Sequence, residues 1–166
     1  MPSFEREFME SNGKPITYNS TEIMLMDTLN VGQEFSVLIT LLSTNSLWRQ
    51  GVKIKTDGWL RITNIVNGKS VTGKNHILWE EGLREIPITI EGYSKKGILF
   101  IFNAWDTGNS VTQAWHNGAA MKREIKGDDI IYYCNDGHPD ENFDDIVFSI
   151  SIKRGDTIIP PQNLLN

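Results

Sequence analysis

The clearest pattern in this chain is a short-range alternation of apolar and polar residues, which is typical of half-buried β-strands. Residues 34–42 show it best, with four apolar side chains on one face: Phe35, Val37, Ile39 and Leu41. Residues 146–153 alternate in the same way. Residues 97–104 are apolar on both faces, which predicts a central strand of a sheet.

Weaker patterns complete the predicted set of elements. Further short strands are predicted at residues 4–8, 15–18, 52–55, 59–66, 85–91 and 129–134. Pro87 cannot donate a ladder hydrogen bond, so its strand is expected at a sheet edge or with a bulge. Asn67 and Gly68 predict a tight hairpin turn. Residues 22–27 and 119–126 fit either a strand or a short helix, and residues 105–118 are expected to form a long surface loop.

These patterns predict an all-β protein. Long amphipathic helical patterns are absent from the sequence, whereas short strands separated by Gly, Asn and Asp turns recur. This combination favours an antiparallel β-sandwich of lectin-like or jelly-roll type. The sequence contains no internal repeat and no linker, so residues 1–166 are expected to form one domain, with residues 155–166 as a C-terminal tail that wraps the surface.

Composition and charge narrow the classes of function. The chain of 166 residues carries a net charge of −5, without the basic stripe that a nucleic-acid-binding surface needs. No apolar run approaches the roughly 20 residues of a membrane span, and no signal peptide is visible. Cys134 stands alone, so an intramolecular disulfide is impossible. We expect a soluble protein made in the cytoplasm, with any release following a route that needs no signal.

Candidate chemistry concentrates in residues 136–145. This segment holds one amide, Asn142, and a dense set of acids: Asp136, Asp140, Glu141, Asp144 and Asp145. The acids repel one another unless a positive charge lies among them, and closely spaced oxygen ligands suit Ca²⁺. A solvated acidic turn is the plainer alternative. Against it, the acids directly abut an apolar strand, and Phe143 is placed to anchor the loop in the core.

Two other metal sites fit the spacing poorly. An EF-hand would place Gly at its sixth position and Glu at its twelfth, but the chain has Asp145 and Ser151 there, and strands flank the loop. A zinc site would need clustered ligands, whereas the candidates are far apart in sequence: His76, His116, Cys134 and His138.

An enzyme is not expected. The adjacent acid pairs, Glu80 with Glu81 and Asp144 with Asp145, would point to opposite faces of a strand and so cannot form an acid/base couple. The sequence contains no nucleophile elbow, no phosphate-binding loop and no zinc-protease helix motif.

The order of residues in the acidic loop matches a known pattern without a gap: Asp136, Asp140, Asn142, Phe143, Asp144 and Asp145, followed by a β-branched strand. It resembles the calcium loop of bacterial calcium-dependent fucose- and mannose-binding lectins of the Pseudomonas second-lectin type, which are small β-sandwich proteins. The resemblance implies a loop that holds Ca²⁺ ions, two in that family, whose coordination is completed by sugar hydroxyls.

The resemblance also implies the residues of the site. The family uses an Asn-Ser pair at the end of an early strand, and Asn45 with Ser46 holds that place here, with Asn19 and Ser20 as a competing pair. The implied metal ligands are Asp136, Asp140, Asn142, Asp144, Asp145 and Asn45. The implied sugar contacts are Asp136, Asp140, Asp145, Ser46 and His138.

This chain departs from that family in two ways. It continues to Asn166, so a terminal carboxylate cannot complete the metal site as it does in the family, and Asp144 replaces the usual Asn. The galactose-binding first-lectin type is a second, weaker resemblance, carried by Asn135-Asp136 and Phe148-Ser149. The sugar and the number of metal ions therefore stay open.

The resulting functional hypothesis is a calcium-dependent lectin whose partner is a carbohydrate or glycoconjugate. Its alternative is a calcium-stabilised adhesion or structural β-module that makes no direct sugar contact. A homo-oligomer is plausible for a lectin, because several sites raise avidity. Trp105 and Trp115 are candidate sugar-stacking platforms and Trp48 a candidate border of the site, whereas Trp59 is expected in the core.

Overall fold

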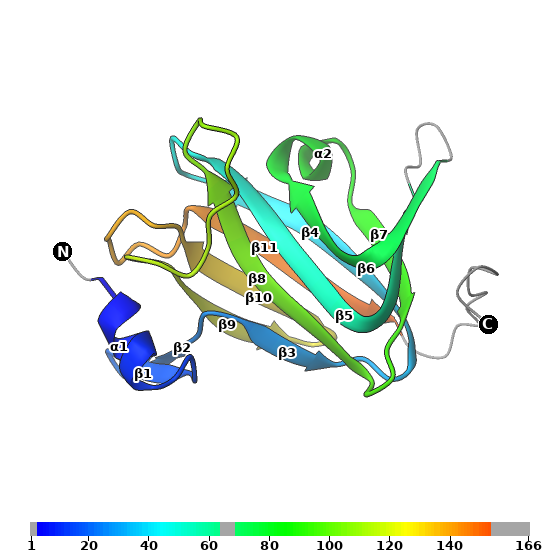
Figure 1. Cartoon of the computed structure of the whole chain (residues 1–166), viewed down its shortest axis with the longest axis horizontal. Helices are drawn as coiled ribbons and strands as arrows, with labels where there is room; N and C mark the ends of the chain where they lie inside the picture. The colour runs from blue at the N-terminus through cyan, green and yellow to red at the C-terminus, as the bar shows by residue number, and fades with distance from the viewer. Residues whose placement is uncertain (1–2, 64–68, 154–166) are drawn as a thin grey trace.

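A computed structural model describes residues 3–63 and 69–153 of the chain. Within these residues it contains two short helices and a set of strands (Figure 1): α1 (Glu5–Glu10), β1 (Ile16–Tyr18), β2 (Thr21–Ile23), β3 (Asp27–Asn30), β4 (Glu34–Thr44), β5 (Arg49–Thr63), β6 (Ser70–Trp79), α2 (Glu80–Glu85), β7 (Ile88–Tyr93), β8 (Ile98–Asp106), β9 (Ala120–Lys126), β10 (Asp129–Asn135) and β11 (Ile146–Lys153). The all-β prediction is confirmed.

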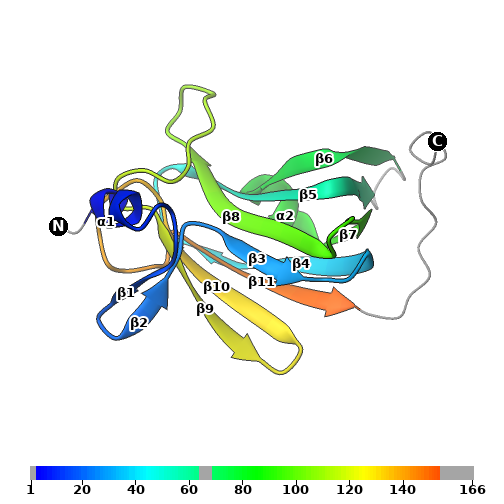
Figure 2. The ribbon, with the colours of Figure 1, turned by 60° about the horizontal axis from the view of Figure 1, so that its bottom comes forward.

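The strands form one main sheet in which neighbours pair antiparallel. It has nine strands in the order β3-β8-β5-β7-β4-β11-β10-β9, and β6 pairs with β5 beside this path. The hairpin of β1 and β2 stands apart. Figure 2 shows that the main sheet curls around the core. The hydrogen bonding joins these strands into one continuous sheet, so the antiparallel all-β architecture is confirmed and the sandwich stays a prediction.

The two terminal strands of the sheet, β3 and β9, are joined by polar contacts. Just before β3, Met24 exchanges two backbone hydrogen bonds with Met121 of β9, with N···O distances of 2.8 and 2.7 Å. Arg123 of β9 donates to both carboxylate oxygens of the buried Asp27, at 3.0 and 2.8 Å. Tyr132 of β10 donates to Asp27 at 2.6 Å. These contacts close the curl.

The closing ion pair perturbs its members. Hydrogen bonds to Asp27 raise the pKa of Arg123 above its usual value. Burial, and then the nearby charge of Asp27, raise the pKa of the Tyr132 hydroxyl. Both groups therefore keep their protons across the physiological pH range, and the Asp27 carboxylate has donors on two strands.

The interior follows the alternation read from the sequence. Phe35, Val37 and Ile39 of β4 are buried, and Leu41 packs against the same cluster. The prediction that β8 is central is confirmed, because β8 pairs with both β3 and β5 and buries Leu99.

Four local predictions are wrong, each for a physical reason. Residues 5–8 lie in α1 rather than in a strand, because Phe8 and the N-cap residue Phe4 are four residues apart and both are buried on one side of the helix. Residues 52–55 and 59–63 belong to one long strand, β5, whose pairing with β6 shifts register between Lys55 and Leu60; the rest of the predicted strand, residues 64–66, lies outside the described residues. The shift absorbs the residues that looked like a turn.

The third wrong prediction concerns residues 85–91. Helix α2 occupies Glu80–Glu85 and β7 begins at Ile88, so Pro87 lies just outside the ladder and removes no hydrogen bond from it. Strand β7 is consequently paired on both sides, with β4 and β5, and is not at an edge.

The fourth is Trp105, which was expected in the surface loop but lies in β8 and is fully buried. Of residues 22–27, the first two end β2, Asp27 begins β3, and residues 24–26 connect them; residues 120–126 form the strand β9. The hairpin at Asn67 and Gly68, and the tail, lie outside the described residues. Among the described residues, neither helix has the length and apolar content needed to cross a membrane.

The Asp27 ion pair yields a test of how the sheet is closed. Asp27→Ala removes the acceptor of Arg123 and Tyr132, and should lower the free energy of unfolding by about 3 kcal/mol, near the lower end for buried pairs because Arg123 is partly exposed. Urea denaturation measures this. Arg6→Ala breaks the exposed Arg6–Glu10 pair and serves as the control, with almost no expected change. Equal, small effects in both variants would show that the Asp27 pair does not hold the sheet ends.

Candidate functional site

The predicted site residues lie on loops that gather at one end of the curled sheet. Figure 1 shows the β4–β5, β8–β9 and β10–β11 loops on the same side of the molecule. The pairing of β4 with β11 causes part of this arrangement. These strands are antiparallel neighbours, with Thr44 opposite Ile146, so the end of β4 lies beside the start of β11. The backbone N–H of Asn45 consequently donates to the Asp145 carbonyl at 3.1 Å.

The Asn-Ser pair contacts the acidic loop through its side chains. The Ser46 hydroxyl donates to Asp136 Oδ2 at 2.6 Å across 90 residues of sequence. The Asn45 amide donates to Asp144 Oδ2 at 2.9 Å across 99 residues. The competing pair, Asn19 and Ser20, forms the turn between β1 and β2 with φ values of 48° and 64°. The structure thus brings together the pair at the end of β4 and the acidic loop.

Asp136 is the most enclosed acid of the loop. Its side chain is fully buried, and its Oδ2 accepts hydrogen bonds from Ser46 and, at 3.0 Å, from the Gln50 amide nitrogen. Its Oδ1 accepts from the backbone N–H of His138 at 2.9 Å. Gln50 is also fully buried, and its Oε1 has no hydrogen-bond partner. A buried polar oxygen therefore lacks a donor next to a buried carboxylate.

Asp145 lies against Asp136 and is held in an unfavourable electrostatic environment. Its Oδ2 accepts the backbone N–H of Asp136 at 2.9 Å, and its side chain is 5% exposed. Burial raises the pKa of Asp145 to about 7, and the charges of Asp136 and Asp140 act in the same direction, although the Asp136 N–H offsets part of the shift. Without a cation, ionising Asp145 near neutral pH is costly.

Asn135, which the sequence indicated only through the weaker resemblance and not as a site residue, spans the base of the acidic loop. Its Oδ1 accepts the backbone N–H of Phe143 at 2.7 Å, and its amide donates to the Asp140 carbonyl at 3.0 Å. Its own carbonyl accepts from Asn103 of β8 at 2.8 Å. Asn135 is fully buried, at the end of β10. A buried Asn just before an acidic loop was the available signal for this role.

A hollow of about 350 Å³ opens beside the loop. It is lined by Asn45, Ser46, Leu47, Trp48, His138, Asp140 and Asp145. Four of the five predicted sugar contacts are in this lining, and Asp136 is not. The Trp48 and His138 rings meet edge-on at 6.4 Å, and Leu47 is fully exposed at the rim. The hollow therefore combines carboxylates with an apolar wall.

The other tryptophans differ in their suitability as platforms. Trp105 is fully buried, so it cannot stack on a sugar at the surface. Trp115 is 42% exposed, but its ring packs on Phe102 at 4.6 Å. Trp59 is 5% exposed, as expected for a core residue.

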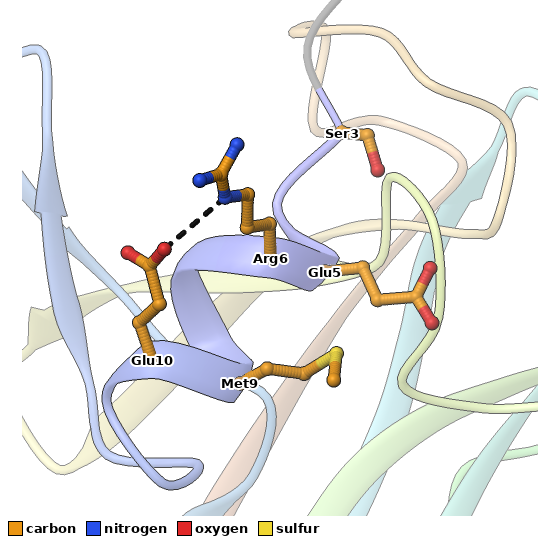
Figure 3. Close-up of a pocket in the computed structure, with 5 residues that line it drawn as sticks. All are labelled: Ser3, Glu5, Arg6, Met9 and Glu10. Atoms are coloured by element: carbon orange, nitrogen blue, oxygen red, sulfur yellow. Dashed lines mark hydrogen bonds and ion pairs between the residues drawn. The ribbon is translucent and has the colours of Figure 1, made fainter.

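A second hollow, of about 440 Å³, lies over α1 (Figure 3). Its lining comes from α1 and Ser3, and includes the exposed Arg6–Glu10 ion pair. Met9, 72% exposed, supplies its apolar surface. No buried polar group faces it in the described residues, so we assign it no chemistry.

The predicted metal ligands are of the right chemical type, but their side chains are not arranged around one metal position. Within residues 3–63 and 69–153, no three His, Cys, Asp or Glu side chains are grouped as ligands around one metal position. Hydrogen bonds instead occupy both oxygens of Asp136, Oδ2 of Asp144, and Oδ1 of Asp140, which accepts the Asn142 N–H at 3.1 Å. The donor set contains only oxygens, which suits Ca²⁺ in kind.

The fold and the site together define an all-β protein with an acidic loop, an Asn-Ser contact and an adjoining hollow. No family model, curated protein or solved structure matches this chain. Functional conclusions for this protein therefore depend on the geometry of its own loops.

The role of Asn135 can be tested without any ligand. Asn135→Ala leaves the Phe143 N–H buried without an acceptor, and should lower the free energy of unfolding by roughly 1–3 kcal/mol. Chemical denaturation measures the loss. Asn142→Ala, at an exposed position of the same loop, is the control and should change stability little. A loss no larger than that of the control would remove Asn135 from its bridging role.

The raised pKa of Asp145 predicts how the metal-free protein responds to pH. The unfolded chain ionises Asp145 near its ordinary value of 3.8, whereas the folded chain retains the proton up to about 7. The folded state binds the extra proton in this interval, so stability should fall as pH rises from about 4 to about 7 and then level off. Thermal unfolding in a chelator measures this. Asp145→Asn should flatten the profile; an unchanged profile would assign the pH dependence to another group.

Proposed function

We propose that this protein binds Ca²⁺ through residues 136–145 and uses the bound ion to bind carbohydrate. The observation that carries the proposal is the meeting of Asn45 and Ser46 with the acidic loop at the edge of a hollow. Both the Asn-Ser pair and the loop were singled out from sequence, about 90 residues apart. An acidic turn that is merely solvated would not need Asn45 and Ser46 as hydrogen-bond donors.

The electrostatics of the loop support a bound cation. Asp136 and Asp145 are buried next to each other, and Asp140 adds to their mutual repulsion. Among the described residues, no Lys or Arg ion pair neutralises a carboxylate of this loop. A divalent ion would relieve the repulsion and favour the ionised form of each acid. The unpartnered Gln50 Oε1 next to Asp136 adds an oxygen ligand of the kind that Ca²⁺ takes.

The hollow supports a polyol as ligand. Vicinal sugar hydroxyls replace water on Ca²⁺, and they also donate charge-assisted hydrogen bonds to carboxylates. Asp140, Asp145 and Ser46 line the hollow, and Trp48 offers an apolar surface for the C–H face of a sugar ring. A homo-oligomer presenting several such hollows would raise avidity.

One observation favours a second candidate, a calcium-stabilised structural module. Asp136 does not line the hollow, and its oxygens already accept three hydrogen bonds from the protein. An ion held there would brace the loops without meeting a ligand. Linkage separates the candidates, because a sugar that coordinates the ion must raise its affinity, and a purely structural ion shows no such coupling.

Calorimetry tests the calcium site. Titration of Ca²⁺ into the wild type should give a binding signal that the double variant Asp140→Ala/Asp145→Ala loses, because two oxygen ligands are removed. Glu141→Ala is the matched control, since Glu141 is an exposed acid of the same loop and not a predicted ligand. Full binding by the double variant would refute the calcium site.

A glycan array tests the carbohydrate proposal. Binding to a subset of glycans should appear with Ca²⁺ and disappear with EDTA, and a positive glycan should raise the apparent Ca²⁺ affinity in calorimetry. Calcium binding without a calcium-dependent glycan signal would favour the structural module.

A further inference from the structure

The N-terminal segment of the chain forms a small hydrophobic cluster with the acidic loop. The cluster is separate from the main core, and its buried members come from α1, β2, β9 and the loop: Phe4, Phe8, Ile23, Ala120 and Phe143. Strand β1, the segment after β2, and β10 add partly buried side chains: Ile16, Tyr18, Leu25 and Tyr133. The loop is thus held both by the edge of the main sheet and by the N-terminal segment outside it.

The first connection is aromatic. The Phe4 and Phe143 rings lie 6.0 Å apart and are 2% and 4% exposed. Phe4 also packs edge-on against Tyr18 of β1 at 4.9 Å. Phe143 lies between Asn142 and Asp144 and has a φ of 53°, a conformation unusual for an aromatic residue. The ring contact therefore helps to set the backbone on which both neighbouring side chains are mounted.

The second connection runs through the backbone of the β8–β9 loop. The N–H groups of Phe4 and Glu5 donate to the Asn117 carbonyl at 3.0 and 3.1 Å, and the Asn117 N–H donates to Glu5 Oε2 at 3.2 Å. The next residue, Gly118, packs directly on the acidic loop. A Cβ at Gly118 would lie 2.5 Å from the His138 carbonyl oxygen, so only glycine allows this approach.

These connections reach opposite ends of the acidic loop. Phe143 is near its end, and His138 is near its beginning. We propose that residues 4–23 act as a clamp that sets the geometry of the acidic loop for ion binding, with Phe4 as a positioning residue. The proposal rests on the calcium site proposed above. The ring of Phe4 contacts Tyr18 and Phe143, and neither of these residues lines the hollow, so the effect of the clamp on the hollow is indirect.

Thermodynamic linkage gives the clamp a signature that ordinary packing lacks. If docking of α1 favours the binding-competent loop, then Ca²⁺ must favour docking of α1 by the same factor. Backbone N–H groups of α1 report on docking, because the Phe8 and Ser11 amides are hydrogen-bonded to Phe4 and Glu7 carbonyls within the helix. Their hydrogen exchange should slow when Ca²⁺ binds.

Phe4→Ala is the direct test. This substitution removes the Phe4–Phe143 ring contact. From the free energy of an aromatic pair, the Ca²⁺ affinity measured by calorimetry should weaken by roughly three- to tenfold. Phe4→Leu keeps apolar volume and should show a smaller loss, and it stands in if Phe4→Ala fails to fold. Ile62→Ala is the control: Ile62 packs against the main core near the opposite end of β5, so it should lower stability and leave affinity unchanged.

The outcomes separate this inference from the function on which it depends. Absence of Ca²⁺ binding by the wild type would overturn the calcium site and the clamp together. Calcium binding with equal affinity in wild type and both Phe4 variants, with α1 exchange unchanged by the ion, would overturn the clamp alone. Weakened binding in the Phe4 variants, unweakened binding in Ile62→Ala, and slowed exchange of α1 amides would support it.

Discussion

The buried carboxylate of Asp136 joins the loops that form the candidate site. Ser46 reaches it from the β4–β5 connection, Gln50 from the start of β5, and the His138 N–H from its own loop. A buried charge needs such donors, because an unsatisfied carboxylate in the interior costs several kcal/mol or more. The positions of the two loops are therefore not independent. A change in the position of the β4–β5 connection would also change the position of the acidic loop, because both contact Asp136.

The second constraint is that the acidic loop has little apolar surface of its own. Phe143 is its buried apolar side chain, and Asn135 holds its backbone from beneath. The N-terminal cluster covers Phe143. The Asp27–Arg123 ion pair and the Met24–Met121 bridge join residues 24–27, just after β2, to β9. The candidate site is thus contacted both by the segment that closes the sheet and by the N-terminal cluster.

Local sequence pattern predicted most strands whose pairing buries one regular face, as in β4, β10 and β11. It failed where the deciding partner was distant. Phe4 and Phe8 form a helical face only because β2, β9 and Phe143 are present to cover it. Pro87 suggested an edge strand, but β7 begins beyond it and is paired on both sides. Trp105 was read with the polar loop that follows it, although it is the last buried part of β8.

The sequence by itself determined that the chain is all-β and that carboxylates crowd into residues 136–145, because side-chain alternation and charge density are local properties. It also singled out Asn45 and Ser46, but it could not exclude Asn19 and Ser20. Only the tertiary structure decided between these pairs, since the register of β4 against β11 sets which Asn-Ser pair meets the loop. The same holds for burial of Asp136, the raised pKa of Asp145 and the contact of Phe4 with Phe143. Each depends on segments distant in sequence, whose approach is a property of the whole fold.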